Sequence, residues 1–64
     1  MLRFYYRAIW EHRNGWQITF SFDVLAVGIN TAEAKARNLV EWYSKNVPNY
    51  FTFKELILTL TETV

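Results

Sequence analysis

The sequence predicts an α+β fold in which a β-hairpin is followed by one α-helix and a third strand. Three observations lead to this order: two neighbouring segments alternate apolar and polar residues, a helical repeat of apolar residues follows, and another alternating segment ends the chain. A right-handed crossover places the last strand beside the first. The expected sheet is antiparallel, with strand order 2-1-3 and the helix on one face.

The turn between the first two strands contains Asn14-Gly15. A two-residue loop would put the apolar residues of the two strands on opposite faces of the sheet. A three-residue loop over residues 13–15 pairs His12 with Trp16 and gathers the large apolar residues on one face. We therefore predict the longer loop, with Gly15 in the left-handed conformation. The residues then expected to face the helix are Phe4, Tyr6, Ala8, Trp10, Ile18, Phe20, Phe22 and Val24.

The next segment has the signals of an α-helix. Asn30 is a suitable N-cap, Glu33 completes a capping box, and Pro48 ends the helix near Asn46. The apolar stripe expected to face the sheet is Ala32, Ala36, Leu39, Val40, Tyr43 and Val47. Two ion pairs are expected on the other side, Glu33–Arg37 and Glu41–Lys45.

The third strand is expected from about Thr52 to Glu62. Its alternation predicts Leu56, Leu58 and Leu60 on the helix side and Glu55, Ile57, Thr59 and Thr61 on the other side. The second strand would be an edge of the sheet without proline or lysine to protect it. A homodimer formed through this edge, residues 16–24, is therefore a hypothesis.

Composition narrows the class of protein to a small single domain spanning residues 1–64, with a net charge of +1. The absence of cysteine excludes disulfides, so the apolar residues, 52% of the chain, must supply the core. No apolar run is long enough to span a membrane. Arg3 and Arg7 interrupt the segment where a signal peptide would be apolar, so we expect a cytoplasmic protein.

No group of residues in the sequence suggests catalysis. His12 is the only histidine and is interpreted as a polar turn residue; the carboxylates are scattered, and Gly15 and Gly28 form no phosphate-binding loop. We therefore expect a protein that is not an enzyme and that uses no metal or cofactor.

Two sets of residues are candidates for binding. Arg3, Tyr5, Arg7 and Arg13 would project from the uncovered sheet face, where they suit phosphate groups or an acidic protein surface. The alternative is a solvated face on which Arg3 and Arg7 balance Asp23. Trp42 and Tyr50 are candidate exposed anchors, although each can instead belong to the core.

Two segments, Gly15-Trp16-Gln17-Ile18-Thr19-Phe20 and Gly28-Ile29-Asn30-Thr31-Ala32-Glu33-Ala34, carry a resemblance to known families. The chain resembles small bacteriophage host-takeover proteins of strand-strand-helix-strand order, among them an inhibitor of bacterial RNA polymerase, and Trp42 matches their late helical tryptophan. It is also similar to HicB-type antitoxin domains, but lacks their Pro-rich turn and extra strand.

The resemblance implies a regulatory or inhibitory protein from a phage or mobile element that binds a host protein. A nucleic-acid-binding module that uses the arginine-bearing face, or an antitoxin, is the alternative.

Overall fold

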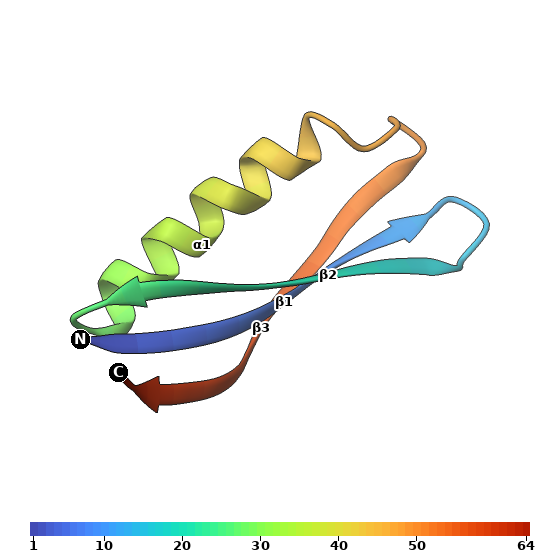
Figure 1. Cartoon of the computed structure of the whole chain (residues 1–64). Helices are drawn as coiled ribbons and strands as arrows, with labels where there is room; N and C mark the ends of the chain where they lie inside the picture. Colours follow the sequence, from blue (N-terminus) through green and yellow to red (C-terminus); the bar gives the residue numbers. More distant parts are fainter.

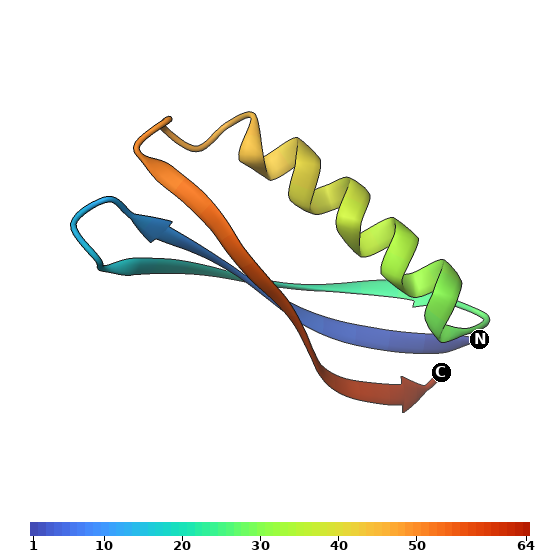
Figure 2. The same cartoon turned by 180° about the vertical axis from the view of Figure 1, so that it is seen from behind.

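The computed structural model describes all residues from 1 to 64 and confirms the predicted fold class. The elements are β1 (Leu2–His12), β2 (Gln17–Ala26), α1 (Ile29–Ser44) and β3 (Phe51–Thr63). The sheet is antiparallel with strand order β2-β1-β3. Figures 1 and 2 show α1 lying across one face of the twisted sheet. We call this the inner face and the opposite side the outer face.

The β1–β2 hairpin has the predicted three-residue loop. Trp10 lies opposite Ile18, and the pairing continues without a shift along the rest of both strands. The backbone N–H of His12 donates to the carbonyl of Trp16 at 2.7 Å. Gly15 has φ of 97°, as the left-handed position requires, and its N–H donates to the His12 carbonyl at 2.8 Å. This loop therefore places the apolar residues of both strands on the inner face.

The start of α1 differs from the prediction. The helix begins at Ile29, its N-cap is Gly28, and no side chain caps it. The predicted cap at Asn30 is wrong because that residue already lies within the first helical turn. Glu33 is consequently free to pair with Arg37, as predicted. The distance between Arg37 Nη2 and Glu33 Oε1 is 2.9 Å.

The end of α1 lies two residues earlier than the predicted stop near Asn46. Ser44 is the last helical residue and Lys45 is the C-cap, whose N–H is shared between two carbonyls, each at 3.3 Å. The Asn46 amide donates to the Trp42 carbonyl at 2.9 Å and satisfies part of the helix end. Lys45 forms no ion pair with Glu41, so that prediction is wrong.

The core is asymmetric along the helix. Near the start of α1, Ala32 and Ala36 pack with Ala26, and these small side chains allow the helix to approach the sheet closely. Toward its end, Val40 packs over the large ring of Trp10. This ring also contacts Phe20 and Phe53 edge-on, with centroids 5.5 and 5.4 Å away. Figure 1 accordingly shows that α1 moves away from β2 toward the C-terminal end of the helix.

The predicted inner residues are buried or half-buried in most positions. The buried side chains are Phe4, Tyr6, Ala8, Trp10, Val24, Ala26, Ala32, Ala36 and Val40. Trp10 donates its indole N–H to Ser44 Oγ at 3.2 Å, which links β1 to the last turn of α1. Phe20 lies on the same face as Trp10, as predicted, but remains 39% exposed.

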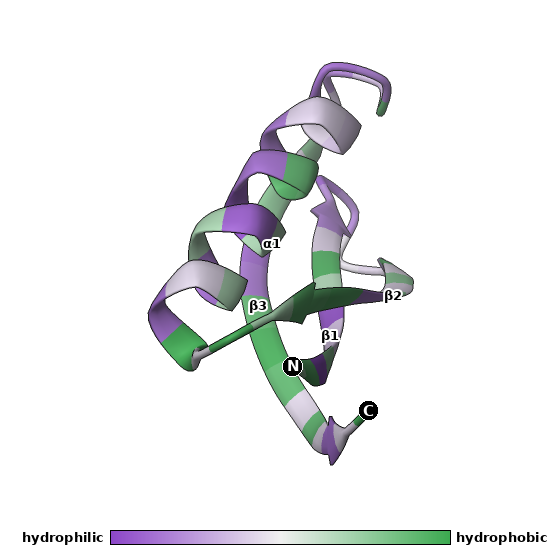
Figure 3. Ribbon diagram, turned by 60° about the vertical axis from the view of Figure 1, so that its left-hand side comes forward, coloured by the Kyte–Doolittle hydropathy of each residue, from purple (hydrophilic) through white to green (hydrophobic).

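The register of β3 shifts twice against β1, once between Tyr5 and Tyr6 and once between Ile9 and Trp10. Thr59 and Lys54 are the extra residues, and each extra residue reverses the face that the following side chains take. Leu60 therefore lies opposite Tyr5 on the outer face, and the prediction that it faces the helix is wrong. Thr61 lies opposite Phe4 instead of on the outer face. The apolar stretch in the middle of β3 is green in Figure 3.

The hydroxyl of Tyr6 is buried without a hydrogen-bond partner. The residue is 4% exposed and stacks on Phe22 with ring centroids 5.9 Å apart. Burial raises the pKa of Tyr6, the Glu33 carboxylate adds to the rise, and Arg37 opposes it. The ring contributes to the core while its oxygen carries a desolvation cost.

Replacing Gly15 by alanine should lower the free energy of unfolding by about 1–2 kcal/mol, because an L-residue is strained at positive φ. A Cβ at Gly15 would meet no atom within 4 Å, so strain is the only expected cause. Urea denaturation measures the change. Gly28→Ser is the matched control, since the N-cap is extended and a serine there should add a few tenths of a kcal/mol. Equal losses at both positions would contradict the assigned role of Gly15.

Tyr6→Phe should raise the free energy of unfolding by about 1 kcal/mol, because it removes an unpaired buried hydroxyl. The raised pKa of Tyr6 means that folding favours the protonated phenol over the ionised one. Stability is therefore unaffected by this titration below pH 10 and is lost as the pH rises through the folded-state value. The variant should therefore lose less stability at alkaline pH in urea denaturation. Tyr50→Phe, at an exposed position, is the control; a less stable Tyr6→Phe would show that the hydroxyl has a partner.

Candidate functional site

The outer face does not form a basic surface. Its basic residues are Arg3, Arg7 and Lys54, and its acidic residues are Glu11, Asp23, Glu55 and Glu62. Arg3 Nε lies 3.4 Å from Asp23 Oδ2, which is the diagonal pair that the solvated-face interpretation expected. Lys54 Nζ lies 3.4 Å from Glu11 Oε2. Arg7 is exposed and has no ion pair, so it does not share Asp23 with Arg3 as expected.

Tyr5 lies half-buried among these charges. The Glu62 carboxylate beside it raises the pKa of the phenol, while Arg3 lowers it in part. The same phenol is the main cause of a raised pKa at Arg3. The three side chains thus form a small polar network at the end of the outer face near the chain termini.

Arg13 lies apart from the other arginines, at the far end of the hairpin. Its Cζ is 5.6 Å from the centre of the Tyr50 ring, and its backbone N–H donates to the Tyr50 carbonyl at 3.1 Å. Two residues predicted as members of different binding surfaces are therefore neighbours. They belong to a cluster of five side chains that we call the aromatic tip: His12, Arg13, Trp16, Tyr50 and Phe51.

The rings of the aromatic tip are arranged around His12. The imidazole stacks on Trp16 with centroids 4.5 Å apart, and Tyr50 and Phe51 meet it edge-on at 5.1 and 5.2 Å. Its Nδ1 accepts a hydrogen bond from the Asn14 backbone N–H at 3.0 Å, which fixes the ring. His12 is thus a turn residue, as interpreted from the sequence, and also the centre of an aromatic cluster, which that interpretation missed.

Local structure explains why these residues meet. The three-residue loop places His12 beside Trp16, and the β1–β3 pairing places Phe51 opposite His12. A turn closed by the Phe51 N–H and the Pro48 carbonyl, 3.0 Å apart, holds Tyr50 at the corner. The tip occupies the end of the sheet opposite both termini (Figure 1).

The tip presents large exposed rings, with 54% of Trp16 and 40% of Tyr50 accessible. Trp16 was absent from the two sets of candidate binding residues, although it begins the edge, residues 16–24, of the homodimer hypothesis. Its pairing with His12 followed from the loop length, so the sequence did hold a signal that it would join a cluster. The approach of Tyr50 had no such signal.

Trp42 is 59% exposed, so the interpretation that it widens the core is wrong. It contacts Tyr43 edge-on at 5.1 Å, and Tyr43 stacks on Phe20 at 5.3 Å with nearly parallel rings. Trp42 contacts no ring of the aromatic tip. The structure therefore separates the two predicted anchors, placing Trp42 on the helix and Tyr50 in the tip.

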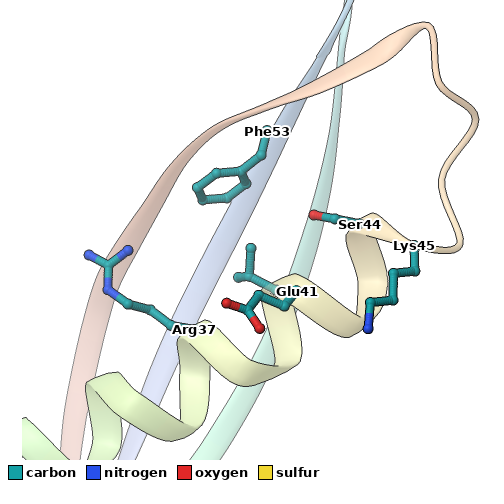
Figure 4. Close-up of a pocket in the computed structure, with 6 residues that line it drawn as sticks. Arg37, Glu41, Ser44, Lys45 and Phe53 are labelled. Carbon is teal, nitrogen blue, oxygen red and sulfur yellow. The ribbon is translucent and has the colours of Figure 1, made fainter.

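A groove of about 410 Å³ lies between α1 and β3 (Figure 4). Phe53 points from β3 toward the helix (Figure 4). Val40 is the other apolar residue that lines the groove. Its polar lining residues are Arg37, Glu41, Ser44 and Lys45. The Ser44 hydroxyl accepts a hydrogen bond from the Trp10 indole N–H. The structure contains no group of three or more side chains that could hold a metal ion.

Comparisons with family models, with curated proteins and with solved structures found no match to this chain. α1 is too short and too polar to cross a membrane. The aromatic tip is a better candidate for a binding surface than the outer face, because it exposes large rings while the outer face carries paired charges.

Glu62→Gln should lower the pKa of Tyr5 toward the ordinary value of 10.0, because the neutral amide no longer opposes ionisation of the phenol. NMR of labelled tyrosine side chains against pH measures the value residue by residue. Glu55→Gln is the control, since Glu55 lies opposite Ile9 on the same face. An unchanged Tyr5 titration would show that Glu62 does not reach the phenol.

Proposed function

We propose that this chain is a small, non-enzymatic cytoplasmic protein that regulates or inhibits a protein partner by binding it through the aromatic tip. The observation that carries the proposal is the juxtaposition of exposed Trp16 and Tyr50 with Arg13. Tryptophan, tyrosine and arginine are the residues most enriched where truncation weakens protein–protein binding most. A phage or mobile-element origin rests on the sequence resemblance described above.

The tip is suited to binding because it is held in place before a partner arrives. Five aromatic contacts join His12, Trp16 and Phe51 to one another and to Tyr50. The Arg13 backbone is tied to Tyr50 by a hydrogen bond of 3.1 Å. Side chains that are already ordered lose less conformational entropy on binding, so more of the contact energy contributes to affinity.

A protein partner is favoured over a nucleic acid because the outer face carries more carboxylates than basic groups. Arg3 is neutralised by Asp23, and Lys54 lies against Glu11. A phosphate backbone would meet these acids, whereas binding to phosphate depends on a surplus of positive charge. The antitoxin alternative has no support beyond the quoted sequence segments.

A double variant, Arg13→Ala with Tyr50→Ala, tests the proposal. Tagged protein recovers partners from a bacterial lysate, mass spectrometry identifies any stoichiometric protein, and calorimetry with that protein measures affinity. Loss of two hot-spot side chains should weaken binding by at least about 100-fold. Arg7→Ala, which removes an exposed arginine outside the tip, should change the dissociation constant by less than about twofold.

Three outcomes would count against this function: recovery of no stoichiometric protein, unchanged affinity in the double variant, or an equal loss in Arg7→Ala. Binding that falls steeply with salt and is competed by DNA or RNA would favour the nucleic-acid alternative. Circular dichroism of each variant checks that the fold is retained.

A further inference from the structure

The two edges of the sheet differ in how well they are protected from pairing with another strand. β3 has two register shifts against β1 and carries Lys54 at one of them. Bulges and lysines are the features that block edge-to-edge pairing in natural sheets. β2 pairs with β1 without a shift and contains neither proline nor lysine. β2 is therefore the open edge of this fold.

The hydrogen bonds of the hairpin show which β2 residues are open. The His12 N–H bonds to the Trp16 carbonyl, and bonded pairs alternate along an antiparallel ladder. The even-numbered residues of β2 thus direct their backbone N–H and C=O groups toward β1. The odd-numbered residues direct theirs toward the open edge of the sheet. Lys35 Nζ already occupies the outward carbonyl of Leu25 at 2.7 Å. The open stretch consequently runs from Gln17 to Asp23.

We infer that this stretch pairs antiparallel with the same stretch of a second copy of the chain, forming a six-stranded sheet across a two-fold axis at Phe20. This dimer goes beyond the proposed function and uses a surface distinct from the Arg13–Tyr50 contact. Phe20 is the midpoint between Gln17 and Asp23, so this register engages every open backbone group. A register displaced by two residues brings Gln17 opposite Leu25, whose carbonyl is occupied by Lys35.

The same register is complementary in its side chains. On the outer face, the Gln17 amide lies opposite the carboxylate of Asp23 of the second copy, and Thr19 lies opposite the hydroxyl of Ser21. On the inner face, the two Phe20 rings meet on the axis. No like charges face each other directly, a juxtaposition that would oppose pairing.

Helix α1 supplies further contact area beside this edge. Trp42 is two turns from Lys35 and so lies on the helix side above β2. It is linked to the edge through Tyr43, which stacks on Phe20. A short strand pairing alone buries less than the roughly 800 Å² per partner of a typical stable interface. The exposed Trp42 ring, facing its counterpart across the axis, adds to that area.

Analytical ultracentrifugation across a concentration series tests the dimer. The wild-type chain of 7.7 kDa should sediment at twice that mass at high concentration. Thr19→Lys should raise the dimer dissociation constant by at least about tenfold, because it puts a charge on the paired edge. Thr52→Lys, an exposed threonine of the opposite edge strand, is the matched control and should leave the constant unchanged.

Amide hydrogen exchange provides a second readout. The Thr19 and Ser21 N–H groups should become protected as the concentration rises. The β2 amides that bond to β1 should be protected at all concentrations. A monomer up to several hundred micromolar, as expected if the edge instead receives a foreign peptide, would overturn the inference. So would a dimer that Thr19→Lys leaves unchanged. Arg13→Ala with Tyr50→Ala should dimerise normally, so failure of the proposed function is distinguishable.

Discussion

The three-residue loop closed by Gly15 is the constraint on which the other contacts depend. It fixes which residues of β1 and β2 face each other, and a slip of one position would turn one strand over. The edge-on contact of Trp10 with Phe20 and the stack of His12 on Trp16 both require this register. A single backbone conformation, φ of 97° at one glycine, is thus required both by the core around Trp10 and by the neighbouring aromatic tip.

Aromatic rings remain exposed at the hairpin end because the helix is shorter than the molecule. An α-helix of 16 residues is roughly 24 Å long, whereas the molecule extends 40 Å in its longest direction. Alanines hold the start of the helix close to β2, so the uncovered part of the inner face lies at the hairpin end. Trp16 and Tyr50 are found there, packed against other rings but still accessible to a partner.

Much of the fold could be predicted because the necessary signals are local. Alternation and Asn14-Gly15 predict the hairpin and its register, and the spacing of Ala32, Ala36 and Val40 predicts the buried side of α1. The shifts at Thr59 and Lys54 have no local signal, because an extra residue in a strand leaves the apolar pattern plausible in either phase. The approach of Tyr50 to Arg13 depends on that same β1–β3 pairing, so the candidate site could not be assembled from the sequence.

The bulges of β3 also give the two margins of the sheet different tolerance of length changes during evolution. Gain or loss of one residue near Thr59 or Lys54 would create or remove a bulge and leave the pairing beyond it recoverable. The same change in β2 would transfer every side chain beyond it to the other face, in a strand whose ladder contains no irregularity to absorb it. Related chains should therefore vary in length along β3 and keep the spacing of β1 and β2 constant.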